Sequence, residues 1–333
     1  MKIGITLSAD YFPINQLIEM VPLVDQMGYS QISVPEIWGH DAFTLLSVLT
    51  QKTKSVTLAT GIVNMFSRSP GTMAMTAASL DELSGGRFTL GLGLSGPKVI
   101  ENWHGMKFTQ PLTRTKEYIE VLRVMLKRER LDHQTSQLGE FKDFRISMRD
   151  FRSDIPIHIA ALGPKNVELT AQIADGWIPV IMPLQAMSDK IKEIHTILEK
   201  NGKDKNTFQI TPFIPTVIGN EPEKIANLKG HLAYYFGGMG TFYNNMLSRI
   251  GFEKEAETII SRWNLGDVKG ASDAISEDLL NEICIFGSVD EAFEQINKFV
   301  KIGVTVPLLS LPFRSKLEHG VETFKALAPM NLK

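Results

Sequence analysis

Residues 74–94, AMTAASLDELSGGRFTLGLGL, contain one complete unit of the pattern that decides the fold. Small and apolar residues recur at helical spacing from Ala74 to Leu83, and the Gly85–Gly86 pair is typical of a helix end. The apolar run Phe88–Leu94 follows at once and predicts a buried strand. A helix that leads through a short turn into a buried strand is the building unit of parallel α/β proteins.

The same alternation continues along the chain. Eight apolar runs predict eight strands, and helical patterns lie between them. The runs are Ile3–Leu7, Ile32–Val34, Val56–Ile62, Phe88–Leu94, Ile155–Ala160, Trp177–Val180, Phe208–Ile218 and Val304–Leu309. The last intervening helix begins at a capping box formed by Ser288 and Glu291. Because eight strands alternate with helices and no linker separates them, we expect a single domain over residues 1–333. Its fold class is α/β, and a closed (β/α)8 TIM barrel fits better than a doubly wound open sheet.

Two long insertions interrupt the rhythm, Ser95–Pro111 after the fourth strand and Asn220–Phe286 after the seventh. Loops that follow the strands build the active site of such barrels, so these insertions are expected to shape a substrate pocket. The alternative is that they only decorate the surface. The uncharged stretch His231–Ser248, which includes Tyr235, is interpreted as a loop or aromatic pocket wall.

Composition excludes several classes of protein. The 333 residues include 35 Lys+Arg and 37 Asp+Glu, so the formal net charge of −2 argues against a nucleic-acid partner. Cys284 is the only cysteine, which excludes an intrachain disulfide and a thiolate zinc site. No histidine pair has metal-ligand spacing, and no apolar run reaches the roughly 18 residues that a membrane span needs. We expect a cytoplasmic protein with a small-molecule substrate and no metal.

Residues 160–166, AALGPKN, place a glycine and a proline where a buried strand passes into a helix. Pro164 suits the first helical position, where its missing N–H costs nothing. The N–H groups of Gly163, Lys165 and Asn166 are then expected to be free at the positive end of the helix. That arrangement suits an anion such as phosphate. The alternative is an ordinary turn whose amides bind water.

Residues 60–64, TGIVN, place a glycine inside an apolar strand. Gly61 there predicts a bulge, or a position where another group, such as a ligand, comes close to the backbone. Asn64 follows the expected strand end and offers both a donor and an acceptor. The alternative is a glycine that only relieves a packing conflict.

Residues 36–41, EIWGHD, bring a carboxylate, an aromatic ring and a titratable imidazole to the rim of the barrel after the second strand. Glu36 and His40 could serve in acid–base chemistry, and Trp38 could stack on a ligand or close the rim. Asp41 is better explained as the N-cap of the following helix. His104, in the first insertion, is a further acid–base candidate whose alternative is a structural role.

Taken together, seven short motifs resemble the bacterial luciferase-like superfamily of flavin and deazaflavin oxidoreductases, and more narrowly its coenzyme F420-dependent branch, which includes methylenetetrahydromethanopterin reductase. They are Glu36-x-Trp38-Gly39-His40-Asp41-Ala42-Phe43, Thr60-Gly61-Ile62-x-Asn64, Arg68-Ser69-Pro70, Leu83-Ser84-Gly85-Gly86-Arg87, Leu90-Gly91-x-Gly93, Ser95-Gly96-Pro97 and Asp175-Gly176-Trp177.

The resemblance implies a cofactor site. It implies a non-prolyl cis peptide between Gly61 and Ile62 that backs the 8-hydroxy-5-deazaflavin ring. It further implies that the ring is lined by Asn64, Gly93 and Ser95. The cofactor phosphate would be held by Leu162, Gly163, Lys165 and Asn166.

Two departures affect the catalytic assignment. The pterin reductases carry a carboxylate on the first strand where this chain has Thr6, and several deazaflavin dehydrogenases carry Asp-His where it has Glu36-Ile37. Glu36 is therefore the first candidate for the catalytic acid, with His40 and His104 behind it. Thr6, together with Trp38 and Tyr235, is expected on the substrate side.

The leading hypothesis is hydride transfer between the deazaflavin C5 of coenzyme F420 and a small organic substrate. The alternatives are an FMN-dependent monooxygenase, a methylenetetrahydromethanopterin reductase-like enzyme and a non-catalytic flavin-binding protein. The apolar and small-residue faces of the helices Ala42–Thr50 and Pro70–Leu83 also favour a homodimer.

Overall fold

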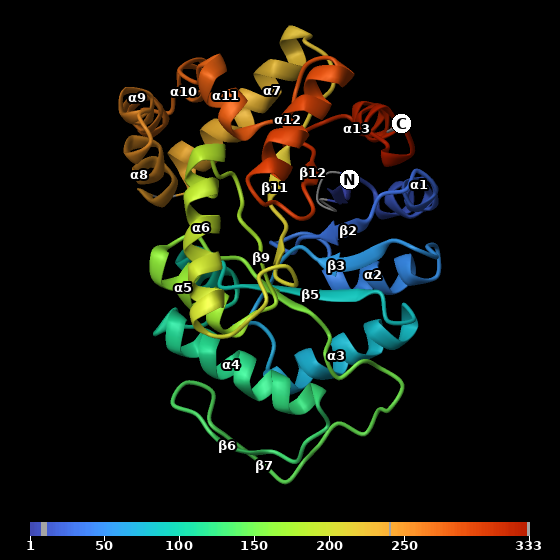
Figure 1. Cartoon of the computed structure of the whole chain (residues 1–333). Helices are drawn as coiled ribbons and strands as arrows, with labels where there is room; N and C mark the ends of the chain where they lie inside the picture. The colour runs from blue at the N-terminus through green and yellow to red at the C-terminus, as the bar shows by residue number, and fades with distance from the viewer. Residues whose placement is uncertain (8–11, 240, 332–333) are drawn as a thin grey trace.

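The computed structural model describes residues 1–7, 12–239 and 241–331, and the side chains of residues 241 and 242 are outside the description. Its strands form a parallel barrel (Figure 1). They are β1 (Gly4–Thr6), β2 (Gln31–Val34), β3 (Thr57–Thr60), β4 (Val63–Asn64), β5 (Phe88–Gly93), β8 (Ile157–Ile159), β9 (Gly176–Trp177), β10 (Gln209–Ile210), β11 (Phe213–Pro215) and β12 (Leu308–Ser310).

Pairing closes this sheet on itself. The order runs from β1 through β2, β3, β5, β8 and β9 to β10, and β11 pairs with β12, which pairs with β1. All of these pairs are parallel, so the predicted (β/α)8 barrel is confirmed. The prediction of one domain over residues 1–333 stays a prediction, although one cluster of buried apolar side chains runs through barrel and insertion alike.

Two of the predicted strands are interrupted. The seventh, expected over Phe208–Ile218, is divided into β10 and β11, because Pro212 between them has no N–H to donate to a ladder. The third is divided into β3 and β4. Ala59 lies opposite Thr89 and Val63 lies opposite Leu92, so the third strand carries one extra residue. This is the bulge that the sequence predicts at Gly61.

Within the described residues, eight helices surround the barrel: α1 (Ile14–Gln26), α2 (Ala42–Thr50), α3 (Pro70–Leu83), α4 (Pro111–Leu126), α5 (Pro164–Ile173), α6 (Leu184–Lys200), α12 (Val289–Lys301) and α13 (Leu317–Ala326). Their starts follow local signals. Asp41 caps α2 by accepting the Thr44 N–H, which confirms its predicted role. The capping box of Ser288 and Glu291 at α12 is also confirmed.

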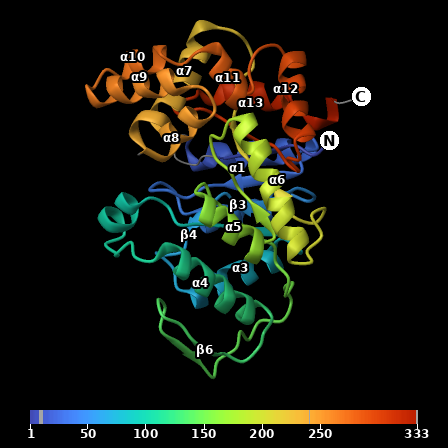
Figure 2. The same ribbon diagram turned by 60° about the vertical axis from the view of Figure 1, so that its left-hand side comes forward.

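The insertion after the seventh strand is a stack of helices at one end of the molecule (Figures 1 and 2). It contains α7 (Pro222–Ala233), the π-helix η2 (Tyr234–Gly238), α8 (Thr241–Arg249), α9 (Glu253–Asn264), α10 (Val268–Asp273) and α11 (Glu277–Ile283). The interpretation of His231–Ser248 as a loop was therefore wrong, within the described residues. Its glycines mislead because Gly237 and Gly238 lie directly against Trp263, where a Cβ on either would collide.

The insertion after the fourth strand contains a π-helix, η1 (Val99–Trp103). A polar hairpin that the sequence did not predict, β6 (Asp132–Gln134) with β7 (Glu140–Lys142), follows α4 and lies at the end opposite the helical stack (Figures 1 and 2). A short 3-10 turn, η3 (Pro329–Asn331), lies near the C-terminus. In the described part of the chain, no helix combines the length and apolarity needed to cross a bilayer.

Candidate functional site at the carboxyl ends of the strands

The bulge between β3 and β4 is held by its neighbours. The Thr60 hydroxyl accepts the Gly91 N–H at 2.7 Å and donates to the Gly91 carbonyl at 2.8 Å. A Cβ on Gly91 would lie 2.6 Å from the Gly61 carbonyl oxygen and closer still to that of Thr60. Only glycine therefore lets the bulge rest on β5.

The expectation of a cis peptide between Gly61 and Ile62 was wrong, because no cis peptide bond occurs in the described residues. Gly61 is nevertheless needed, since a Cβ there would lie 2.8 Å from the Pro35 nitrogen.

The bulge brings the expected ring-lining residues together. Asn64 lies opposite Gly93 in the ladder between β4 and β5, and the Ile62 side chain reaches to within 3.4 Å of where a Gly93 Cβ would be. Ser95 follows β5 in the left-handed region, with φ of 59°. These residues share the carboxyl ends of adjacent strands, which is where such barrels place their sites.

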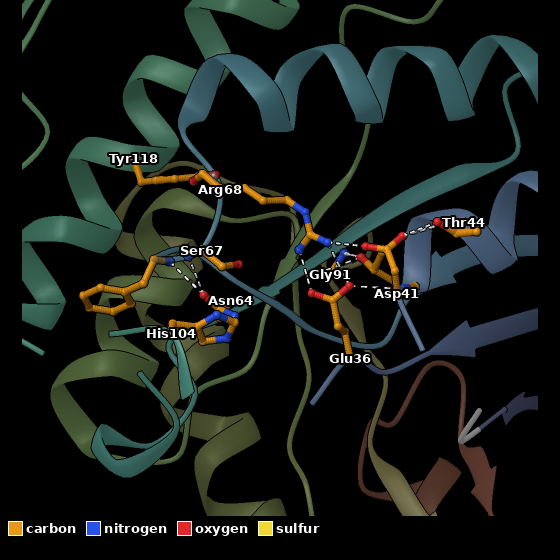
Figure 3. A network of polar contacts seen from close by, with 12 residues as sticks. Glu36, Asp41, Thr44, Asn64, Ser67, Arg68, Gly91, His104 and Tyr118 are labelled. Carbon is orange, nitrogen blue, oxygen red and sulfur yellow. Dashed lines mark hydrogen bonds and ion pairs between the residues drawn. The ribbon is translucent and has the colours of Figure 1, made fainter. Parts of the chain in front are cut away.

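Asn64 is the centre of a small polar network (Figure 3). Its Oδ1 accepts the backbone N–H groups of Phe66 at 3.0 Å and Ser67 at 2.7 Å. Its Nδ2 lies 3.1 Å from Nε2 of the half-buried His104. The Ser67 hydroxyl beside it is buried and has no hydrogen-bond partner among the described residues.

Glu36 is held by an arginine from the next loop (Figure 3). Arg68 donates from Nη1 to Oε1 of Glu36 at 2.6 Å and from Nη2 to Oε2 at 3.0 Å, and it also pairs with Asp41. The Ala42 N–H donates to the same Oε2 at 3.0 Å. Because both oxygens of Glu36 are occupied, proton transfer through this carboxylate would require the ion pair to open.

Electrostatics around this ion pair favour the charged forms of Arg68 and Asp41. Burial opposes the charge of Arg68, but hydrogen bonds and charge interactions with Glu36 and Asp41 outweigh it and raise the pKa of the guanidinium. For Asp41, burial is again outweighed, by the Thr44 amide and hydroxyl and by Arg68, so its pKa is lowered. The Arg68 guanidinium also lies over the Phe43 ring, 4.9 Å from its centre.

Arg68 was missed as a site residue by sequence reasoning. It appears in the Arg68-Ser69-Pro70 motif, but nothing local connects it with Glu36, 32 residues earlier. The available signal was two carboxylates, Glu36 and Asp41, in one loop without a nearby cation. His40 and Trp38 in that loop are exposed, and 52% of Trp38 is accessible.

The start of α5 supports the anion prediction only in part. Gly163 is the N-cap and contributes no side chain, and the space beside it is open. The Asn166 N–H, expected to be free, instead donates to the Gly163 carbonyl at 3.0 Å in a tight first turn. Lys165 is exposed and Leu162 is half-buried. Asn166 Oδ1 is buried without a donor among the described residues, which leaves one acceptor for a ligand hydroxyl.

The expected substrate residues come from different elements of the fold. Thr6 ends β1, is buried, and its hydroxyl lies 3.5 Å from the Leu309 carbonyl oxygen. Tyr235 belongs to η2 and stacks on Phe313 with ring centres 5.8 Å apart and nearly parallel planes. Burial, reinforced by Tyr234, raises the pKa of Tyr235 well above its usual range.

A cavity of about 830 Å³ lies at the opposite, amino-terminal ends of the strands. Its cations already serve the fold. Arg87 donates to carbonyl groups and to the Thr53 hydroxyl, Arg123 pairs with Asp175, and Lys203 binds the carbonyls that end α5. This end therefore stabilises the barrel, and the carboxyl-end site is the better candidate, because barrels of this kind place their active sites at the carboxyl ends of the strands. In the part of the chain that the structure describes, no group of three or more potential metal ligands is present.

Comparisons with known proteins found similarity over nearly the whole chain. A family model described as luciferase-like monooxygenase matches residues 1–306. A Mycobacterium tuberculosis protein assigned by inference as a coenzyme F420-dependent oxidoreductase is 32% identical, over 93% of this chain and 95% of that protein. The solved F420-dependent tetrahydromethanopterin reductase of Methanopyrus kandleri superposes with a TM-score of 0.81 at 22% identity, covering 97% of this chain and 96% of that one. The FMN complex of a type II Baeyer–Villiger monooxygenase from Pseudomonas putida gives a TM-score of 0.71 at 13% identity, covering 99% and 97%.

Proposed function

Because this chain belongs to the luciferase-like monooxygenase family, we propose that it is an oxidoreductase that uses coenzyme F420 and transfers a hydride between the deazaflavin C5 and a small organic substrate. The oxidoreductase class follows from the family and its relatives. The single observation that carries the choice of cofactor is the 32% identity to an F420-dependent relative across 93% of the chain.

The residues at the carboxyl ends fit such a cofactor. The Ile62 side chain packs beside Gly93, and the apolar surface that they form with the bulge at Gly61, next to Ser95, suits one face of a flat ring. The open space at Gly163 and the exposed Lys165 suit the phosphate of the cofactor tail. The buried Asn166 Oδ1 would accept a hydroxyl of the tail, because an acceptor repels phosphate oxygens.

When bound, the deazaflavin supplies or accepts the hydride, and the protein supplies binding and orientation. Among the acid–base candidates, Glu36 is committed to Arg68 and His40 is exposed, so His104 is the best placed to hold a proton near the site. Thr6 and Trp38 stay proposed substrate contacts. Tyr235 is proposed as part of the wall that the helical insertion contributes.

Cofactor titration tests this proposal directly. Isothermal calorimetry of the purified protein with F420 and, separately, with FMN should show tight binding of F420 only. A G163W variant should weaken that binding, because an indole would fill the open space beside α5. G230A, in α7, is a less perturbing control, because a Cβ there would come no closer than 3.9 Å to the Ser272 hydroxyl. Tight FMN binding without F420 binding would overturn the proposal.

An FMN-dependent monooxygenase is the second candidate, favoured by the match to the FMN-bound neighbour. It predicts oxygen consumption with reduced flavin, which a 5-deazaflavin does not support. A methylenetetrahydromethanopterin reductase-like activity is a narrower form of the main proposal, and substrate assays would identify it. A non-catalytic flavin-binding protein would bind a chromophore and show no turnover.

We also propose a cytoplasmic homodimer. The helices α2 and α3 expose the apolar side chains Val48, Met75 and Leu83 on neighbouring elements, with Met75 54% accessible. Burial of such a patch against a second copy would remove it from water. The only cysteine, Cys284, is buried and unpaired, as suits a reducing compartment. Sedimentation at micromolar concentration should give twice the mass of one chain, and a monomer would refute the stable dimer.

A further inference from the structure

We propose that Asn64 is a positioning residue that holds His104 as a neutral imidazole with its proton on Nδ1. In this view Asn64 does not use its polar atoms on the cofactor. The inference about the imidazole rests on geometry alone, and only its role in the reaction rests on the proposed function.

The orientation of the Asn64 amide is determined by the backbone. Two N–H groups, from Phe66 and Ser67, donate to the same side-chain atom at 3.0 and 2.7 Å. Only the carbonyl oxygen of the amide can accept two such bonds, since the NH2 group has donors alone. A flipped amide would place NH2 hydrogens against two N–H hydrogens, so the assignment of oxygen and nitrogen is secure.

The amide orientation then determines the state of the histidine. Asn64 Nδ2 faces His104 Nε2 at 3.1 Å, and the amide nitrogen is the donor of this pair. Nε2 must therefore be the acceptor, without a proton. A neutral imidazole carries one N–H, so that hydrogen lies on Nδ1. An imidazolium, or the other neutral tautomer, would set an Nε2–H against the NH2 group.

The surroundings favour this arrangement energetically. Only 6% of Asn64 is accessible, so the competing bonds to water that would weaken the network are largely excluded. His104 also ends η1, where its own N–H donates to the Val99 carbonyl at 3.2 Å. The bond between the two side chains therefore ties the first insertion to the end of β4.

The chemical consequence is a hydrogen-bond donor that needs no charge. A neutral imidazole held by a donor at its other nitrogen stabilises an oxygen that gains negative charge, as in the known use of histidine as an electrophile. If the substrate is a ketone or aldehyde, hydride addition to the carbonyl carbon moves the π pair onto the oxygen. When bound, the reduced cofactor would supply that hydride, and a proton from water would complete the alcohol. His104 Nδ1–H would stabilise that oxygen.

Nuclear magnetic resonance of protein labelled with 15N-histidine tests the inference. Long-range 1H–15N correlation spectra distinguish the two neutral tautomers, and loss of one signal in H104Q assigns His104. At pH 8, wild-type protein should show the Nδ1–H form. In Asn64→Asp, both carboxylate oxygens accept, so the proton should move to Nε2 or the ring should become doubly protonated. Asn64→Leu, which has a similar size and no polar atoms, should lose the preference for one tautomer.

A wild-type spectrum with the proton on Nε2, or one that N64D leaves unchanged, would overturn the proposal. Cofactor calorimetry separates the inference from the proposed function. If wild-type protein binds no F420, the proposed function fails while the tautomer result still stands.

Discussion

Replacing Arg68 by methionine (R68M) would remove the guanidinium that neutralises Glu36 and Asp41 while keeping a side chain of similar length. Among the described residues, Glu36 would then keep the hydrogen bond from the Ala42 N–H but would have no positively charged partner at this site. The side chain of Glu36 is 12% exposed and that of Arg68 is 19% exposed, so water replaces the lost charge poorly. We expect the free energy of unfolding to fall substantially.

The magnitude follows from the burial. Removing one partner of a fully buried ion pair costs about 3–5 kcal/mol. Because both side chains retain some exposure, we expect roughly 2–3 kcal/mol for R68M, which is a 30- to 150-fold change in the unfolding equilibrium. Loss of the guanidinium contact with Phe43 adds to this cost within the same range.

Arg130 provides a matched control. It pairs with Asp143 at 3.0 Å, but both side chains are 73% exposed. R130M should therefore cost less than about 1 kcal/mol. Equilibrium unfolding in urea, followed by far-UV circular dichroism, measures both variants. If R68M and R130M lie within about 0.5 kcal/mol of one another at equal m-values, the argument from burial is wrong.

Three further predictions concern other parts of the fold. G91A should prevent folding or cost more than about 3 kcal/mol, because its Cβ would overlap the bulge carbonyls, whereas G96A, in open space, should change stability little by thermal melting. Burial lowers the pKa of His158 in the native protein to about 4. Between about pH 4 and 6.5, His158 is therefore protonated in the unfolded chain but neutral in the native protein. Stability should therefore rise with pH across that window, and H158Q should flatten the slope in pH-dependent urea unfolding without abolishing it, because burial also lowers the pKa of His231 to about 3. The pKa of Asp41 is lowered in the folded protein, so its carboxylate contributes to the free energy of unfolding fully above the unfolded pKa of 3.8. That contribution is lost as the pH falls through the lower folded pKa. D41N should therefore be less stable than the wild type at pH 7 and approach its stability in acid.

Local sequence patterns predicted the architecture well because the forces that set helices and strands act over a few residues. The periodic apolar residues of 74–94 predict a helix and a strand that the structure contains as α3 and β5. The caps at Asp41 and Ser288 were predicted correctly for the same reason, since a cap bonds three residues along the chain.

Errors arose where a local signal has two meanings. Glycines in His231–Ser248 suggested a loop, but Gly237 and Gly238 admit the ring of Trp263 between helices. The strand expected over Phe208–Ile218 contains Pro212. Because proline has no N–H, its effect depends on whether the neighbouring strand would accept a hydrogen bond at that position. The amide of Asn166 was expected to be free, yet a tight first turn uses it.

The sequence by itself determined the barrel, its eight-fold alternation and the segments that carry the site, because hydrophobic period and turn chemistry are written in neighbouring residues. Only the tertiary structure decided the partners within the site. Glu36 contacts Arg68, which lies 32 residues further along the chain, and Asn64 contacts His104, which lies 40 residues further. Both contacts depend on the register of the strands and on the one extra residue in the bulge. A shift of one residue would turn these side chains to the other face of the sheet. No pattern within a single segment contains that information.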